Sequence, residues 1–439
     1  MIELISILAQ FIIFLVIFSF PFNPKNLNKI LKLSNNPLNY IDCHALNIIF
    51  ILNALLIMSF FSIDLRVIFT ILLLISLTLI IYRLKEIQSL ISTKNILEFI
   101  FFAIIIISIF ISTAEMLKIE WDGHHWITKA LVFFHNKNIH HLQESNMPEY
   151  PHLGGYVWAF FWKNSILELE YFGRYFYIYF YIVSIFTIFN VLNFKSEKLS
   201  YILIFALIFL SYDPYLFSGY QDYLIFSTLA ISARFIALID FDKIIDYKKI
   251  IIILSTMHLL MWFKDEGLFY FLIFGTLLIF LSKSSIRTKL LLFVLILSIG
   301  YLQSLLQKNI IGIYGFNTEI ISKKIIDQLL NIKLLILKTI AISKHIVIAF
   351  LKYPLWILII LSFLFFNNFN KKNSSLIKYF FYAFILNIFL IYAVYLHDPN
   401  PYEFILSVTL DRLMFQTSGF YILVFVLLLN KSKLKNINL

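Results

Sequence analysis

The sequence predicts an all-α polytopic membrane protein, a bundle of about 11 to 13 transmembrane helices with outer-face loops and interfacial helices. Composition is the first reason: 61% of the residues are hydrophobic, 14% are charged, and the mean hydropathy is +0.86. A soluble domain could not cover so much apolar surface with so few charges. The other two reasons are a succession of apolar runs long enough to cross a bilayer and the basic residues in the short loops between them.

Charge and cysteine content exclude several classes of protein. The net charge of +11 does not indicate nucleic-acid binding, because the basic residues sit in short loops between apolar spans, as orientation signals do. The single cysteine, Cys43, excludes an internal disulfide and a cysteine-based metal cluster. Residues 1–20 are apolar without a basic start or a small-residue cleavage site, so we expect a retained first span.

The first four spans are expected near residues 2–21, 45–62, 67–82 and 96–115. The loops between them alternate in charge. Basic residues occupy the loops 22–44 and 83–95 (Lys25, Lys29, Lys32, Arg83, Lys85 and Lys94), whereas the 63–66 turn has one Asp and one Arg. The positive-inside rule places the two basic loops in the cytoplasm, and therefore residues 117–170 on the opposite face.

Nine further spans are expected near residues 172–193, 199–211, 222–240, 250–263, 267–281, 290–306, 346–366, 379–396 and 417–430. Each predicted inner loop is again basic: Lys195 and Lys198; Lys243, Lys248 and Lys249; Lys283, Arg287 and Lys289; Lys371, Lys372 and Lys378; Lys431, Lys433 and Lys435. Some runs, such as 250–263, are too short to cross alone and are expected to be tilted, broken or shielded.

The same alternation places five polar stretches on the outer face: 117–170, 212–222, 263–267, 307–345 and 397–416. Lysines recur among Ile and Leu in 307–345, which predicts an amphipathic helix on the membrane, most simply a connector held at the interface. The first stretch stands out, because residues 121–162 contain six of the chain's ten histidines together with Asp122, Lys129 and Glu149. Polar chemistry gathered in one segment of a membrane protein predicts a functional site there.

Five segments carry the residues that such a site needs: WDGHHWITKALVFF (121–134), YPHLGGYVWAFFW (150–162), SGYQD (218–222), KDEG (264–267) and DRLMFQ (411–416). In this order the chain resembles integral-membrane glycosyltransferases of the GT-C superfamily, especially bacterial members that use a polyprenyl-phosphate sugar donor. The likeness covers roughly residues 96–430. Two features depart from the family pattern: the His124-His125 pair, and Asp265 where Asn is commoner.

This resemblance implies a domain organisation and a reaction. Residues 1–95 would be an N-terminal transmembrane extension of three spans, and residues 96–439 a GT-C-like glycosyltransferase core with its first outer loop at 117–170. The resemblance also implies an inverting transfer of a sugar on the outer face of the inner membrane, with the essential acid on that first outer loop.

The chemistry of such a transfer selects Asp122 as the catalytic base. A carboxylate must take the proton from the acceptor hydroxyl, and Asp122 follows closely after the 96–115 span, between Trp121 and Trp126. A water-excluding pocket must also protect the donor from hydrolysis. The alternative is an ordinary interfacial Asp whose tryptophans belong to the aromatic belt.

Cations must hold the donor phosphate, and Lys129, Lys264 and Arg412 are the candidates. Arg412 leads, since a guanidinium can bind two phosphate oxygens. Lys129 lies two helical turns from Asp122, so a plain ion pair with it is the alternative. Pairing with Asp265 or Glu266 is the alternative for Lys264.

Buried charges near spans need partners or an aqueous cavity, which applies to Arg174, Arg234, Lys264 and Arg412. Asp222 and Glu266 are expected either to bind substrate hydroxyls or to neutralise these cations. The remaining substrate-binding candidates are Trp121, His124, His125, Trp126 and Tyr150.

The histidines leave a metal site as an alternative, made of His124, His125 and His152 with a carboxylate. No helical ligand spacing such as HExxH supports it, so we predict no cofactor and keep a divalent metal as the alternative. The expected partners are the polyprenyl-phosphate sugar donor, membrane lipids and a glycan, lipid or protein acceptor, but no nucleic acid. A secondary transporter, or a lipid-linked oligosaccharide polymerase or flippase, is the alternative function.

Overall fold

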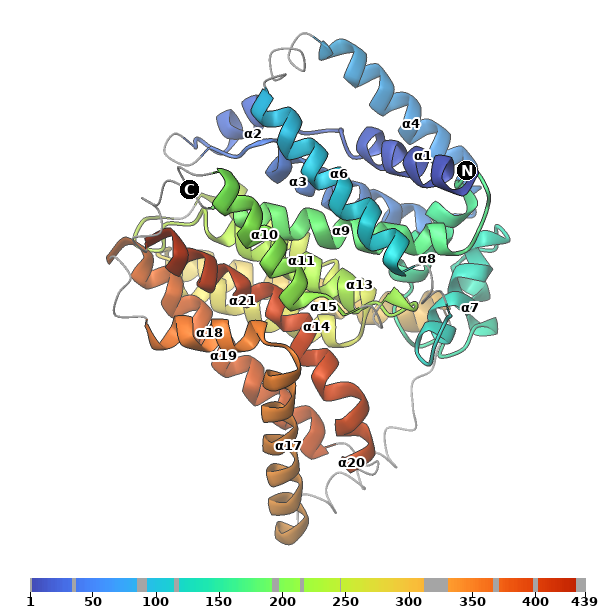
Figure 1. Cartoon of the computed structure of the whole chain (residues 1–439). Coiled ribbons are helices and arrows are strands. Elements are labelled where there is room, and N and C mark those ends of the chain that lie inside the picture. Colours follow the sequence, from blue (N-terminus) through green and yellow to red (C-terminus); the bar gives the residue numbers. More distant parts are fainter. Residues whose placement is uncertain are drawn as a thin grey trace. The chain divides into compact units, whose positions relative to one another are not determined.

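The computed structural model describes residues 2–33, 37–84, 93–113, 118–191, 197–213, 217–244, 246–311, 331–365, 371–397 and 402–431. Their regular secondary structure is helical, apart from one isolated β-bridge between Ile244 and Lys283 (Figure 1). The predicted all-α class is therefore confirmed, and the number of long apolar helices is that of a multi-pass membrane protein.

The chain divides into two compact units. Unit 1 comprises residues 1–190 and 213–227, and unit 2 comprises residues 191–212 and 228–439. The division at residue 95, which the family resemblance suggested, does not coincide with this one and stays a prediction. The two units are described separately below.

Unit 1 is built around a helix that is buried almost along its whole length. Its helices are α1 (Ile2–Ile17), α2 (Pro24–Ile30), α3 (Tyr40–Ser59), α4 (Leu65–Tyr82), α6 (Thr93–Thr113), α7 (Gly123–Phe134), α8 (Leu153–Lys163) and α9 (Tyr171–Phe189), with a 3₁₀-helix η2 (Ile139–Glu144). Every α9 residue from Phe172 onward is buried, and α1, α3, α6 and α8 all pack against it. Its aromatic side chains explain this position, since they bury large apolar areas and pack edge-to-face with Phe14 and Phe102.

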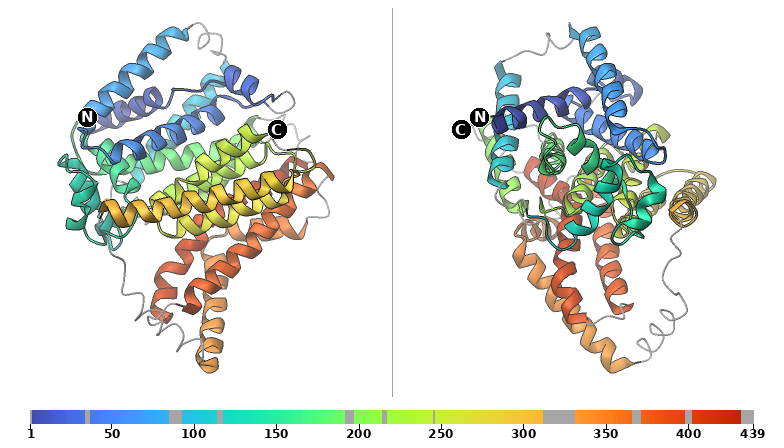
Figure 2. Two further views of the ribbon diagram at one scale, coloured as in Figure 1. Left: turned by 180° about the vertical axis from the view of Figure 1, so that it is seen from behind. Right: turned by 90° about the vertical axis from the view of Figure 1, so that its right-hand side faces the viewer.

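One end of unit 1 holds the described residues that border the predicted basic loops. The side chain of Asn190, just after α9, donates to Asn39 before α3, and Arg83 at the end of α4 donates to the carbonyl of Pro21. The short helix α2 also lies at this end (Figures 1 and 2). We call it the basic end.

The opposite end of unit 1 holds α7, so we call it the loop end (Figures 1 and 2). Here the α3–α4 turn meets the polar loop, because Asn136 donates to Asp64 at 2.8 Å and Arg66 pairs with Glu168. Within unit 1, the described residues that border loops 22–44 and 83–95 thus lie at one end and α7 lies at the other, as the alternation of charge predicts, and the assignment of these ends to the two sides of a membrane stays a prediction.

Unit 2 contains the C-terminal helices: α10 (Glu197–Ser211), the greater part of α11 (Asp222–Ile236), α12 (Tyr247–Met257), α13 (Leu260–Phe263), α14 (Glu266–Leu281), α15 (Ile286–Ile311), α17 (Ile332–Lys352), α18 (Leu355–Leu364), α19 (Lys371–His397), α20 (Tyr402–Ile405), a π-helix η5 (Leu406–Leu410) and α21 (Asp411–Lys431). Described residues of three of its predicted basic loops contact one another. Ile244 bridges to Lys283, and Ser375 donates to Asp242.

Seven described helices are long and apolar enough to cross a membrane, and five more are apolar but shorter. The expected run 250–263 is broken into α12 and α13, as its length suggested. The expected span 346–366 is instead two helices, α17 and α18, which separate at Pro354 because proline cannot continue the preceding helix.

Two of the predicted polar stretches are helical in the part of the chain that the structure describes. Residues 307–311 end α15 and residues 332–345 belong to α17, whose length and hydropathy suit a membrane span; the interfacial position of this stretch stays a prediction. Lys338 of α17 is buried and donates to the carbonyl of Leu396. Residues 402–416 are also helical, so Arg412 lies in the first turn of α21, directly after the π-helix; residues 312–330 and 398–401 lie outside the described part of the chain.

Candidate functional site

The candidate site of unit 1 forms where the turn before α7 rests on the SGYQD segment. Asp122 is the N-cap residue of α7, and Gly123 is its first helical residue. A Cβ at Gly123 would lie 2.4 Å from the carbonyl oxygen of Ser218, and one at Gly219 would lie 2.9 Å from the Cα of Gly123. The backbone N–H of Glu120 also donates to Ser218 at 3.4 Å. Two of the five motifs therefore converge beside Asp122, and they do so through glycine-to-backbone contacts.

Arg174 fixes the second of these turns. Its guanidinium makes a bidentate pair with Glu170 at 2.7 and 2.8 Å, and donates to the carbonyl of Phe217 at 2.9 Å. It also lies over the Trp158 ring, 5.5 Å from the centroid. The prediction that this buried cation has a partner is confirmed, and the partner is Glu170.

An aromatic group lines the same face of α7 as Asp122. Residues 125 and 126 follow Asp122 by one helical turn, and Tyr150 stacks on Trp126 with a centroid distance of 5.9 Å and an interplanar angle of 17°. Tyr150 also meets the His125 ring edge-on at 6.5 Å. Nδ1 of His125 is buried and has no hydrogen-bond partner among the described residues. We call Trp121, Asp122, His124, His125, Trp126 and Tyr150 the α7 site.

Lys129 lies below this site, fully buried in α7. Its ammonium donates to three main-chain carbonyls, those of Met147 at 2.7 Å, Tyr150 at 3.1 Å and Pro148 at 3.3 Å. A Cβ at Gly155 would lie 2.9 Å from the Cβ of Lys129, so α8 crosses α7 closely at this point. The three ammonium protons thus have protein acceptors. The expected phosphate role stays a prediction, and it would require a phosphate oxygen to replace one of these carbonyls.

His152 is a buried, neutral histidine rather than a part of the α7 site. Its Nε2 lies 2.7 Å from the hydroxyl of Ser59, and its ring packs against Phe60 and Phe133. Because the hydroxyl proton of Ser59 goes to the carbonyl of Leu56, Nε2 donates to Ser59. Burial, and then the charge of Lys129, lower the pKa of His152 to about 3.

A second polar chain ties α8 to the SGYQD segment. The amide of Gln221 donates to the hydroxyl of Tyr177 at 2.9 Å, and that hydroxyl donates to the carbonyl of Gly154 at 3.3 Å. A Cβ at Gly154 would lie only 1.8 Å from Oε1 of Gln221. Glycine is required here because α8 and the Gln221 side chain approach so closely.

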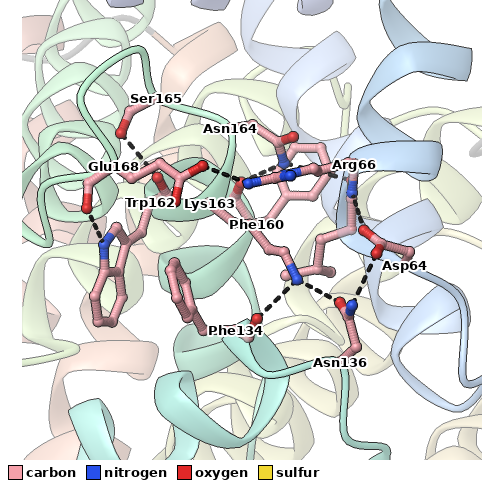
Figure 3. A network of polar contacts seen from close by, with 11 residues as sticks. Asp64, Arg66, Phe134, Asn136, Phe160, Trp162, Lys163, Asn164, Ser165 and Glu168 are labelled. Atoms are coloured by element: carbon pink, nitrogen blue, oxygen red, sulfur yellow. Dashed lines mark hydrogen bonds and ion pairs between the residues drawn. The ribbon is translucent and has the colours of Figure 1, made fainter.

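The loop end is braced by the polar network of Figure 3. Lys163 donates to the carbonyl of Phe134 and to Asn136, and Asn136 in turn donates to Asp64. The backbone N–H of Arg66 is the main reason that the pKa of Asp64 is lowered, and the Lys163 charge acts in the same direction. The network joins the α3–α4 turn to both ends of the segment that carries the α7 site.

Unit 2 brings its own predicted residues together. Lys264 is buried and pairs with Glu266 at 3.2 Å, which is the ion pair expected as the alternative to phosphate binding. The hydroxyl of Tyr395 hydrogen bonds Thr409 at 2.6 Å, and it lies within electrostatic range of both Glu266 and Arg412. The KDEG segment, the end of α19 and the start of α21 therefore converge within unit 2.

The predicted residues thus fall into two groups. Asp222 is buried at the start of α11, in the turn that supports the α7 site. The proximity of Asp122 to Lys264 and Arg412 concerns two separate units and stays a prediction. The metal alternative is not supported, since no three His, Cys, Asp or Glu side chains group closely enough to hold an ion within the described ranges, and His152 is committed to Ser59.

Sequence reasoning did not identify Gln221, Tyr177 or Lys163 as positioning residues. Gln221 could have been identified from its position in the SGYQD motif, directly before Asp222. Lys163 directly follows the second motif, where a lone basic residue among aromatics needs partners. Tyr177 has no such signal, because it is one of many tyrosines in α9.

Comparisons with family models, with curated proteins and with solved structures found no match to this chain. The function is therefore argued from the residues, their geometry and the resemblance of the motifs.

Proposed function

We propose that this protein is a membrane glycosyltransferase that moves a sugar from a polyprenyl-phosphate donor to an acceptor by inverting single displacement, on the periplasmic face of the inner membrane. Asp122 is the general base, and Lys264 and Arg412 hold the donor phosphate. The observation that carries the proposal is the setting of Asp122: a half-buried carboxylate on a turn locked to the SGYQD segment, with His125, Trp126 and Tyr150 on its face.

This setting suits proton abstraction from a hydroxyl. The carboxylate is carried by the rigid start of a helix, and the buried Nδ1 of His125 offers a neighbouring polar atom to a bound hydroxyl or phosphate. The cluster of Lys264, Glu266, Tyr395 and Arg412 supplies the positive charge that a departing phosphate requires. Buried charge held in this way beside membrane helices is typical of functional sites.

The test compares purified wild type with Asp122→Asn for consumption of a panel of polyprenyl-phosphate sugars. We expect the variant to lose about 100-fold or more in turnover, the usual range for a lost general base. Glu144→Gln is the matched control, since Glu144 is exposed in the same loop and pairs only with the exposed Lys137 in the contacts described here. Equal turnover of Asp122→Asn and wild type would remove Asp122 from the mechanism, and no consumption by the wild type would reject the activity. Loss of wild-type turnover on adding EDTA would establish a metal requirement.

A further inference from the structure

The residue next to the proposed base has an unusual backbone. Trp121 has φ +39°, the left-handed region that side chains other than glycine rarely adopt. Three hydrogen bonds close a tight turn around it: Gly123 N–H to Glu120, His124 N–H to Trp121 itself, and His125 N–H to Asp122. The turn is clamped from below by the Gly123–Ser218 contact. The turn therefore holds Trp121 in a conformation that glycine would adopt with less strain.

The Trp121 side chain is directed into solvent or lipid. It is 71% exposed, whereas Trp126, Trp158, Trp262 and Trp356 are at most 4% exposed and Trp162 is partly covered. Trp162 stacks on Phe134, but Trp121 contacts no aromatic ring within the described ranges. A large, rigid and uncovered ring is thus presented one residue before Asp122.

We propose that Trp121 is the platform for the acceptor, and that the acceptor is a carbohydrate ring. This rests on the proposed function and deepens it. A sugar ring has an apolar face of C–H groups that packs on an indole, and hydroxyls at its rim. A sugar stacked on Trp121 would bind one residue along the chain from the proposed base, Asp122.

Backbone strain favours this role over simple membrane anchoring. An anchoring tryptophan needs only depth in the interface and can stand on relaxed backbone. Strain that the surrounding contacts enforce is characteristic of positions where a side chain must point in one direction. Here the strained residue is the one directly before the proposed base, Asp122.

The first experiment uses tryptophan fluorescence of the full-length protein in nanodiscs, taking the difference between wild type and Trp121→Phe to isolate the Trp121 signal. We expect aqueous iodide to quench this signal, and a panel of methyl glycosides of hexoses, N-acetylhexosamines and pentoses to protect it. Quenching by brominated lipid with no protection by any glycoside would overturn the platform and identify a membrane anchor. Because this measurement needs no turnover, it stands even if no polyprenyl-phosphate sugar is consumed.

The second experiment uses Trp121→Gly, which relieves the strain and removes the ring. We expect this variant to unfold at a higher temperature than wild type while losing the affinity for the glycoside that protects the wild type. In the transfer assay, its KM for the acceptor should rise about tenfold or more with a smaller change in kcat, the loss that corresponds to one stacked ring. Trp121→Tyr should restore most of the lost KM. Unchanged KM in Trp121→Gly would overturn the proposal.

Discussion

The replacement Lys129→Met tests whether the buried ammonium organises the segment that carries Tyr150. Three carbonyls accept from Lys129, at 2.7, 3.1 and 3.3 Å. A hydrogen bond to a charged group contributes about 1.5–3 kcal/mol. The 2.7 Å bond has the short length typical of a charged donor, whereas the other two bonds are longer, and the carbonyl segment is partly open to water, so we count one full bond and two weak ones. The methionine also relieves the cost of burying a charge.

We therefore expect Lys129→Met to lower the free energy of unfolding by about 2–3 kcal/mol. The assay is denaturation in mixed detergent, with hydrogen exchange of the amides of Met147, Glu149 and Tyr150 as the local readout. Lys137→Met is the matched control, because Lys137 is exposed and its pair with Glu144 contributes less than about 1 kcal/mol.

Two outcomes would contradict this reasoning. Equal stability of Lys129→Met and the Lys137→Met control would mean that the three carbonyls find water at no cost. Unchanged exchange at 147–150 in a destabilised Lys129→Met protein would mean that the lysine supports α7 alone, and not the Tyr150 segment.

Gly154→Ala should destabilise unit 1 by about 1–3 kcal/mol, because its methyl group would displace Gln221. Gly300→Ala is the control, since only a leucine methyl lies within 3.4 Å of the added Cβ. In the same unfolding assay its free energy of unfolding should be unchanged or rise by up to about 1 kcal/mol. The pH dependence of stability should report His152. Its folded pKa lies below the unfolded value of about 6.5, so the unfolded chain binds the extra proton and stability falls as pH drops from about 6.5 toward 3, by up to about 1.4 kcal/mol per pH unit. His152→Gln, which keeps a donor for Ser59, should flatten this slope, and an unchanged slope would assign the titration to other groups.

The helical class, the alternation of the loops and the partner for Arg174 were all predictable, because they follow from composition, charge and the cost of burying an unpaired cation. The surroundings of Lys129 were not. Its acceptors are carbonyls of irregular backbone at 147–150, and the direction of a carbonyl leaves no trace in side-chain identity. Lys338 is a similar case, because its partner is also a main-chain carbonyl, that of Leu396, which the sequence does not reveal.

The candidate site was predictable to the level of motifs. Sequence order suggested that WDG and SGYQD belong together, and unit 1 places them in contact. Sequence order did not suggest the form of this contact. The contact joins two glycines and a main-chain carbonyl oxygen, so no side chain takes part that a hydropathy or charge pattern could reveal.

Because Gly123 and Gly219 lie against each other, a substitution at one position restricts the substitutions possible at the other. Neither position has room for even a methyl group while the other turn stays where it is. In a homologue with a side chain at either position, the two turns would have to lie farther apart, and the acid at position 122 would be displaced. Among descendants that keep an acid at position 122 in use, the two glycines should be retained or lost as a pair.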